Sequence, residues 1–525
     1  FTSDVTEIGY GAFNGCSSLV NLVFDGSLQY LGDYAFASCS SLPSVLIPAG
    51  CEYLGNFAFG SCSSLEAVTF SADAVVREIG EGVFYGDYDV TAFTVEPGSK
   101  YLTVSNGVLY TRDMTKLVLM PAGKIAGGFT VPGSVREIGD YAFSYKGGVN
   151  NVYLPSVRKI GKNAFMNCTV RSVSSIGNLT EIGDRAFYNC PYLVVFELPD
   201  GLETIGANAF YGCVAITWGD FTLPASVTTV GEYAFCGNYG ITGFTVPAQL
   251  TAIADGMFAQ CKNLTKVTLH DNVTEIGGYA FRKCEALEEI ALPESVTTIG
   301  EACFAETGLK KIALPSALSE IPAYCFYGDR ALTEITVPAS VTGIGNFAFY
   351  QTTALKNLDL ANVRELGSYA LIGSAVETLR ADRLETVGNY TFFGTAIASL
   401  NLPELTVIGD YAFANMEKLT AFSAEKTETV GVAAFYRTAK LRELNLPACK
   451  DIGDYAFMLA SSLEKINLGK LEKLGTYAFY STRLTKLSLP ATVESIAPGD
   501  YAATMTVGTA QQLSLRGAGQ AGAQE

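Results

Sequence analysis

The sequence predicts a repeat solenoid built around parallel β-strands. One phrase, L-x-x-I-x-L-P-x-x-V-x-x-I-G-x-x-A-F, recurs along almost the whole chain of 525 residues. Its phenylalanine returns at a nearly constant spacing, apart from one much longer interval between Phe84 and Phe143, and Leu371 replaces it once. Such regular self-similarity is typical of stacked repeats, in which each unit buries its apolar side against the next.

Each part of the phrase predicts one part of a coil. The I-x-L piece alternates with period two, so we expect a strand with two inward side chains and one outward side chain. The proline that often follows, as at Pro199, cannot donate a hydrogen bond and ends the strand. The glycine of the I-G step either has a positive φ or allows close approach of the next coil. An Asp or Asn such as Asp33 then caps a short turn of helix that carries A-F.

The predicted fold class is therefore an α/β repeat solenoid, a right-handed superhelix with a parallel β-sheet and short helical or 3₁₀ segments. We expect about 20 repeats over residues 1–500, with a β-meander inserted near residues 95–128. Asn106-Gly107 predicts a tight hairpin, with strands near 101–105, 108–111 and 116–120. This insert is interpreted as a buttress rather than a ligand site. Residues 501–525 are expected to form a cap strand or the start of a truncated domain, followed by a disordered tail.

Composition excludes several classes of partner. The 35 Lys and Arg residues against 52 Asp and Glu residues give a net charge of −17, and the basic residues are scattered. Nucleic acid and anionic membrane surfaces are therefore not expected as partners. No apolar run reaches the length of a membrane span. The chain begins at Phe1 without the features of a signal peptide, so we expect a mature or trimmed segment.

The repeated phrase "L..I.LP..V..IG..AF..C" resembles the BspA-like leucine-rich repeat, also called the Treponema-type repeat, over residues 1–500. That family commonly carries a similar "DGVLY" insert, in which Asn106 replaces the Asp here. The resemblance implies a curved parallel-sheet solenoid on an exported or surface-anchored bacterial protein. It also implies an extracellular or cell-surface location, and adhesion to host or neighbouring-cell surface proteins.

Thirteen cysteines and one histidine are the candidates for chemistry. Eight cysteines stand three residues after the repeat's phenylalanine, and we call this position F+3: Cys16, Cys39, Cys62, Cys168, Cys190, Cys213, Cys261 and Cys284. We interpret them as reduced, buried packing residues that bind no metal. Cysteines of adjacent coils would lie one strand spacing apart, which is slightly too far for a relaxed disulfide, and their pattern does not match a zinc site. His270 occupies a proline slot, so we expect no catalytic site and no cofactor. Calcium between coils stays open as a minor alternative.

Function is therefore expected in binding. Outward positions of the strands carry varied charges, and we predict a ligand site on this strand face at Lys266, Glu289, Lys311, Glu334, Asp359 and Arg380. We expect this face to be concave and to bind a macromolecule, without catalysis. The alternative is a carbohydrate-binding surface module, which a recurring tyrosine two residues before the phenylalanine would support, as at Tyr369 and Tyr411. Stacking of these rings on one another is the favoured interpretation of that column.

Overall fold

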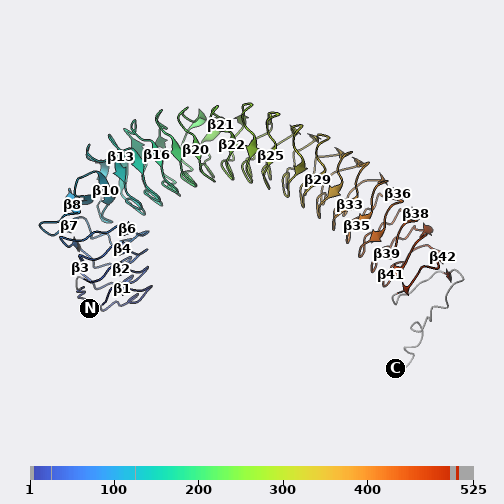
Figure 1. Ribbon diagram of the computed structural model, residues 1–525, viewed down its shortest axis with the longest axis horizontal. Coiled ribbons are helices and arrows are strands. Elements are labelled where there is room, and N and C mark those ends of the chain that lie inside the picture. The colour runs from blue at the N-terminus through green and yellow to red at the C-terminus, as the bar shows by residue number, and fades with distance from the viewer. Residues whose placement is uncertain (1–4, 25–26, 125, 497–503, 508–525) are drawn as a thin grey trace, which may run out of the picture. The chain divides into compact units, whose positions relative to one another are not determined.

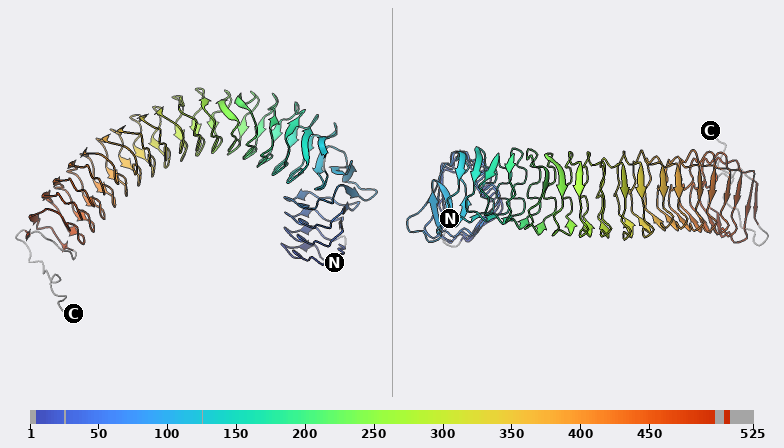
Figure 2. Two further views of the ribbon diagram at one scale, coloured as in Figure 1. Left: turned by 180° about the vertical axis from the view of Figure 1, so that it is seen from behind. Right: turned by 90° about the horizontal axis from the view of Figure 1, so that it is seen from above.

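The computed structural model describes residues 5–24, 27–124, 126–496 and 504–507, which belong to two compact units. Unit 1 comprises Phe1–Leu250 and Ala254–Leu264, and unit 2 comprises Thr251–Ile253 and Thr265–Glu525. Each unit is a stack of coils whose strands lie side by side, which confirms the predicted solenoid of parallel strands (Figures 1 and 2). Nowhere in the described parts of the chain is there a helix long and apolar enough to cross a membrane.

A regular coil contributes two strands rather than the single strand that was predicted. The first is the expected I-x-L strand, as in β23 (Lys266–Thr268). The second is a two-residue strand just before the glycine of the I-G step, as in β24 (Glu275–Ile276). We call the two resulting rows of strands the I-x-L ladder and the I-G ladder.

In unit 1 both ladders consist of parallel pairs, and the insert consists of antiparallel ones. The I-G ladder contains β1 (Glu7–Ile8), β2 (Tyr30–Leu31), β4 (Tyr53–Leu54), β6 (Glu78–Ile79), β12 (Glu137–Ile138), β14 (Lys159–Ile160), β16 (Glu181–Ile182), β18 (Thr204–Ile205) and β20 (Thr229–Val230). The I-x-L ladder contains β3 (Ser44–Ile47), β5 (Ala67–Phe70), β7 (Phe93–Val95), β11 (Ala126–Thr130), β13 (Val149–Tyr153), β15 (Ser172–Ser174), β17 (Val195–Phe196), β19 (Gly219–Thr222) and β21 (Ile241–Thr245). The insert contains β8 (Leu102–Ser105), β9 (Val108–Thr111) and β10 (Lys116–Leu119).

Unit 2 repeats this arrangement without an insert. Its I-G ladder contains β22 (Ala252–Ile253), β24, β25 (Thr298–Ile299), β27 (Glu320–Ile321), β29 (Gly343–Ile344), β31 (Glu365–Leu366), β33 (Thr386–Val387), β35 (Val407–Ile408), β37 (Thr429–Val430), β39 (Asp451–Ile452), β41 (Lys473–Leu474) and β43 (Ser495–Ile496). Its I-x-L ladder contains β23, β26 (Lys311–Ala313), β28 (Glu334–Thr336), β30 (Asn357–Asp359), β32 (Thr378–Arg380), β34 (Ser399–Asn401), β36 (Ala421–Ser423), β38 (Glu443–Asn445), β40 (Lys465–Asn467), β42 (Lys486–Leu489) and β44 (Thr504–Val507). β44 falls in the predicted C-terminal segment and pairs with β42, whereas residues 508–525 lie outside the described part.

The core of each unit is a column of stacked phenylalanines between the ladders. Phe143 and Phe165 lie 4.6 Å apart between ring centroids at an interplanar angle of 12°, and the stack continues to Phe187 at 4.9 Å. In unit 2 Phe304 stacks in the same way on Phe326. The small alanine that precedes most of these phenylalanines is also buried, as at Ala142 and Ala348, so successive rings lie within contact of one another. The repeated A-F pair thus forms a continuous apolar core.

The segment that carries A-F is a series of turns, so the expected helical or 3₁₀ segment is wrong. Tyr34 and Ser38 have φ values of 55° and 59°, which no right-handed helix accommodates. The amide of Ala35 donates to Gly32 O in its own coil at 3.2 Å, whereas the amide of Phe36 donates to Ala58 O in the next coil at 2.8 Å. Alternate amides therefore bond across coils, and a helix would use all of them within one coil.

The predicted capping role of the aspartates and asparagines is also wrong. Asp33 Oδ1 accepts a hydrogen bond from the amide of Asn56 at 2.7 Å, and Asn56 Oδ1 accepts one from the amide of Glu81 at 2.7 Å. Asp410 and Asp454 bond the following coil in the same way. Since no helix begins at these positions, the side chains connect successive coils instead of capping their own.

The glycine of the I-G step allows close approach rather than a positive φ. Gly55 has an ordinary φ, but a Cβ added there would overlap the backbone of Gly32 and Asp33 in the preceding coil. The same overlap would occur at Gly345 against Ala323. A larger residue at Gly55 or Gly345 would therefore push neighbouring coils apart, although Ala254 and Pro322 occupy the same step in two other coils.

The two ladders of unit 2 differ in continuity. Its I-G ladder runs unbroken through nine strands from β27 to β43, whereas its I-x-L ladder is divided into short sheets such as β26–β28 and β30–β32. Coils therefore lie closer on the I-G side and are further apart on the I-x-L side, as β39 and β41 against β38 and β42 show in Figure 1. The expectation of a concave I-x-L face is wrong for this unit, because its I-x-L strands lie on the convex side.

The predicted meander is confirmed in unit 1. β8, β9 and β10 form antiparallel pairs, and Asn106 and Gly107 connect β8 to β9 with φ values of 49° and 76°. Two successive positive φ values are characteristic of the tight hairpin turn that Asn-Gly favours. β10 also pairs in parallel with β12, so the insert continues into the I-G ladder.

Candidate functional site

All six predicted ligand residues are exposed on the I-x-L side of unit 2. Lys266 lies on β23, Lys311 on β26 and Glu334 on β28. Glu289 forms an isolated bridge to Lys311, and Asp359 and Arg380 lie on β30 and β32. The prediction that these side chains point outward is confirmed, because the residue between two outward positions is buried in β23, β26 and β30.

Register pairs most of these charges with one another. Lys311 and Glu334 are partners across β26 and β28, and Lys311 Nζ lies 3.2 Å from Glu334 Oε2. Arg380 Nη1 lies 3.7 Å from Asp359 Oδ2, and its Nε donates to Asp382 at 2.7 Å. Exposed pairs of this kind stabilise a fold by at most about 1 kcal/mol. They leave both signs of charge accessible to a partner.

A hollow of about 710 Å³ lies where the I-x-L ladder is broken between β28 and β30. Lys311, Glu334, Asp359 and Arg380 line its rim. Its floor contains Ile335, Leu358 and Leu379, of which Ile335 and Leu379 are only half-buried. The gap between the sheets therefore exposes aliphatic side chains that an unbroken ladder would cover.

A second and smaller hollow, of about 310 Å³, lies beside the first. Glu289, Lys311 and Glu334 contribute to its lining, so two of its charged residues also belong to the first hollow. Five of the six predicted residues therefore surround this pair of hollows, and Lys266 lies outside both linings. We refer to the two hollows and their charged rims as the convex-face site.

The tyrosine columns stack on themselves, which confirms the favoured interpretation. Tyr324, Phe347, Tyr369, Tyr390 and Tyr411 form one run, with centroid distances of 4.7 to 5.1 Å and interplanar angles of 1° to 7°. A neighbouring ring covers each face of the inner members, so their edges rather than their faces remain for solvent. Sugars bind to ring faces, and these inner rings do not offer that surface.

The cysteines behave as buried apolar residues, apart from Cys16, which is exposed. Cys62 Sγ donates to Phe36 O at 3.2 Å and Cys213 Sγ to Phe187 O at 3.1 Å. Burial raises the pKa of the Cys51 and Cys62 thiols to about 12. Such thiols are weak nucleophiles and poor metal ligands. The redox state of the thirteen cysteines stays a prediction.

The remaining candidates for chemistry are scattered. Over the described residues, no three His, Cys, Asp or Glu side chains gather in a way that could hold a metal ion. His270 lies in a turn, where its Nδ1 accepts a hydrogen bond from the amide of Asn272 at 3.1 Å. This contact fits a structural role in the proline slot.

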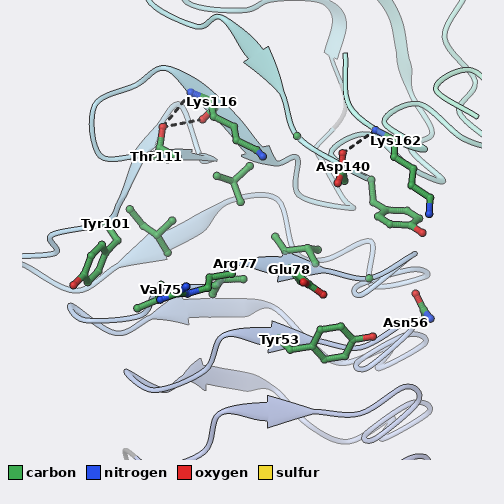
Figure 3. A pocket seen from close by; sticks show the side chains of 17 residues that line it. Tyr53, Asn56, Val75, Arg77, Glu78, Tyr101, Thr111, Lys116, Asp140 and Lys162 are labelled. Carbon is green, nitrogen blue, oxygen red and sulfur yellow. Dashed lines mark hydrogen bonds between the residues drawn. The ribbon is translucent and has the colours of Figure 1, made fainter. Parts of the chain in front are cut away.

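Unit 1 contains a cleft of about 650 Å³ beside the insert (Figure 3). Arg77, Glu78 and Ile79 of the β6 coil line one side of it. Lys116 of the insert lies across from them, Tyr101 lies at one end near Val75, and Asp140 and Lys162 of the next coils lie near the other end, as Figure 3 shows. We refer to this space as the insert cleft.

Sequence reasoning identified the exposed charges but neither the hollows nor the insert cleft. Both spaces occur where a ladder is interrupted, and the unusually long interval between Phe84 and Phe143 was the available signal for the cleft. No comparable signal marks the break between β28 and β30, because the repeats there have regular lengths.

These features define a leucine-rich-repeat solenoid without a recognisable catalytic centre in its described residues. A model of the BspA type leucine rich repeat region matches six stretches, residues 1–108, 127–242, 217–331, 251–378, 319–421 and 385–504. The chain therefore belongs to the BspA-type leucine-rich-repeat family.

Several solved structures are similar to this chain, and the first of them has the same fold. A leucine-rich repeat protein from Bacteroides ovatus is 22% identical over 78% of this chain and 98% of its own, with a TM-score of 0.51. One from Eubacterium ventriosum is 25% identical over 59% of this chain and 76% of its own, with a TM-score of 0.42. A leucine rich cell surface protein from Faecalibacterium prausnitzii is 21% identical over 70% and 95%, with a TM-score of 0.37. A search of curated proteins finds no match.

Proposed function

We propose that this chain is a non-catalytic cell-surface interaction protein that binds a protein ligand at the convex-face site. The observation that carries the proposal is the hollow between β28 and β30, where half-buried Ile335 and Leu379 lie within a rim of both charge signs. An apolar centre inside a polar rim is the usual anatomy of a protein–protein interface. Membership of the BspA-type family supports an adhesive role and a location outside the cell.

The rim favours a partner with complementary charges of both signs. Lys311 and Arg380 each have an acidic neighbour, so the site presents alternating rather than uniform potential. Such alternation selects partner and orientation more than it adds affinity. The ligand is therefore expected to be a folded protein surface or a protein segment rather than a polyanion.

The test compares wild type with the double charge reversal Lys266→Glu and Lys311→Glu on arrays of extracellular-matrix and cell-surface proteins. Wild type should bind at least one arrayed protein, and the double variant should bind it at least tenfold more weakly with an unchanged melting temperature. The matched control is Lys450→Glu, which removes an exposed ion pair of 2.8 Å to Glu428 outside the convex-face site. Equal loss in the control, or no loss in the double variant, would place the ligand elsewhere.

A glycan array run in parallel tests the alternative carbohydrate-binding function. Binding to glycans that Tyr369→Ala abolishes would favour that alternative over the convex-face site. The stacked geometry of the Tyr324 to Tyr411 run predicts no such binding.

A further inference from the structure

The insert cleft contains an open strand edge of the I-G ladder. β6 is the last strand of the row β1-β2-β4-β6, and within the described part of the chain it pairs only with β4. Beyond it the insert intervenes, and the I-G ladder resumes at β10 and β12 in another sheet. The β6 edge that faces away from β4 therefore has no strand partner among the described residues.

The coils that precede β6 show which main-chain hydrogen bonds are missing at this edge. The amide of Glu52 donates to Gln29 O at 2.9 Å, and the amide of Gly55 donates to Leu31 O at 2.7 Å. The amides of Arg77 and Gly80 repeat these bonds to Glu52 O and Leu54 O, at 2.8 and 2.7 Å. The corresponding acceptors of the β6 coil are the carbonyls of Arg77 and Ile79, and neither accepts a bond in the described structure.

The side chain of Ile79 gives a second, independent indication. Leu31 and Leu54, which occupy the same column in the coils below, are fully buried because another coil covers each of them. Ile79 is only half-buried and lines the insert cleft. The cleft thus lacks both the main-chain donors and the aliphatic side chain that a further coil would supply.

The insert, on the opposite side of the cleft, supplies neither these main-chain donors nor this aliphatic side chain. β10 already pairs with β9 on one edge and β12 on the other. Thr111 Oγ1 accepts a bond from the amide of Lys116 at 3.0 Å, which ties the insert to itself. The space of about 650 Å³ between the two sides is of the size that ligand pockets have.

We propose that the insert cleft binds one extended peptide segment, which adds to β6 as a parallel strand. Addition of a strand to an open sheet edge is a common mode of peptide recognition, in which main-chain bonds give affinity and side-chain pockets give specificity. The occupant must present two amide donors in the spacing of the ladder, one to Arg77 O and one to Ile79 O.

The repeat also defines the residues of the occupant. An aliphatic residue is required over Ile79, as in every regular coil of the I-G ladder. Glycine is the best fit at the next position, because a Cβ at Gly80 would overlap the backbone of the preceding coil and most coils have glycine at this step, with Ala254 and Pro322 as exceptions. The residue before the aliphatic one points outward and is polar. The partner is therefore a polar–aliphatic–glycine segment in an unpaired loop or chain end of another protein.

The test uses a fluorescein-labelled, N-acetylated peptide with the sequence NVTEIGGY, which is that of residues 272–279. The control peptide carries an N-methyl group on the first glycine, so that it cannot donate to Ile79 O. Fluorescence polarisation should show binding of the first peptide to the full chain and at least tenfold weaker binding of the control. The protein variant Ile79→Ser should weaken binding by a similar factor, whereas Glu78→Ala, which alters the outward residue, should not.

Hydrogen exchange followed by mass spectrometry locates the site. The amides of Arg77 and Gly80 already donate to the preceding coil, but no further strand covers this edge. Residues 76–80 should therefore exchange more slowly with the peptide present than without it, whereas the internal strand β16 should exchange equally slowly in both states. Equal binding of the two peptides, no binding at all, or protection confined to the first strand β1 would each overturn the proposal. The proposal does not depend on the convex-face site, because the two lie in different units.

Discussion

The carboxylate of Asp329 accepts two hydrogen bonds from Thr307 of the preceding coil, one from its amide at 2.6 Å and one from its hydroxyl at 3.0 Å. Asp329 is fully buried at the F+3 position, where Cys39 and Cys62 stand in other coils. Its Oδ2 has no partner in the described structure. Burial raises the pKa of Asp329 well above its usual range, and burial raises the pKa of Asp87, at the same position, to about 8.

We therefore expect stability to fall as pH rises. A carboxyl group has a pKa of about 3.9 in an unfolded chain. The pKa of Asp87 is about 8 in the folded state. The stability that its protonated form contributes is therefore complete below about pH 4 and is lost as the pH rises to about 8. Lys146, whose pKa burial lowers to about 8, stays charged in both states over most of this range and does not cancel the effect. Melting temperatures measured from pH 4 to pH 8 check this expectation.

The variant Asp329→Asn should raise the melting temperature at pH 8 and change it little at pH 4. Its amide oxygen keeps both bonds to Thr307, and its Nδ2 can donate as that of Asn238 does at the same position, to Phe210 O at 2.9 Å and Phe235 O at 2.7 Å. Asp359→Asn, at an exposed site, is the control and should show no such pH-dependent gain. An equal gain at pH 4 and pH 8 would contradict the explanation by ionisation.

Two glycines in one coil should respond differently to alanine. Gly345→Ala should destabilise unit 2 by at least about 2 kcal/mol, because its Cβ would overlap the backbone of Ala323. Gly343→Ala, two residues earlier in β29, has open space around the added Cβ and should change stability by less than about 0.5 kcal/mol. Urea denaturation of both variants provides the comparison, and similar losses would show that close approach is not the reason for the I-G glycine.

The phenylalanine column should tolerate leucine better than alanine. Phe281 is fully buried and stacks on Phe304 at a centroid distance of 5.8 Å. Phe281→Ala should destabilise by about 3–5 kcal/mol, because it leaves a cavity in the core. Phe281→Leu should cost about 1–2 kcal/mol, since Leu371 fills the same slot in its coil and is fully buried. Calorimetry of the two variants would disprove this account if leucine were as damaging as alanine.

Alkylation should separate Cys16 from the other cysteines. Cys16 is exposed, and the other twelve are buried, several with a raised pKa. Iodoacetamide at pH 7.5 should therefore label Cys16 in the folded protein and all thirteen thiols in guanidinium chloride. Mass spectrometry without a reducing agent provides the count. Fewer than thirteen labels in the denatured protein would reveal blocked thiols and contradict the prediction that the cysteines are reduced.

The sequence was sufficient for those features that have a regular period. The I-x-L strands, the phenylalanine core and the Asn106-Gly107 hairpin each follow from alternation or from turn chemistry that a single coil displays. The I-G ladder was not predicted, because a two-residue strand such as β24 is too short to show a period. The turns around A-F were mistaken for helix, because Tyr34 and its equivalents adopt a left-handed φ that tyrosine rarely adopts.

The candidate site divides in the same way. Lys311 and Glu334 are separated by one repeat, so their pairing could have been derived from the register. The hollow between β28 and β30 could not, because no residue pattern within a single repeat marks where the I-x-L ladder is broken. Whether a residue points outward follows from its position in a single strand, whereas the place where a ladder breaks depends on the packing of many coils.

The hydrogen bonds that backbone amides donate from one coil to the next restrict how the gene for such a chain can change in length. Each coil uses half of the amides in its A-F segment for itself and gives the rest to its neighbour, as Ala35 and Phe36 do. Loss of one whole repeat, for example the stretch from Val432 to Gly453, would bring equivalent donors and acceptors together again. Loss of half a coil would misalign every bond across the junction. Recombination between repeats is therefore a permitted route of evolution for this protein, whereas deletions inside the A-F segment are not.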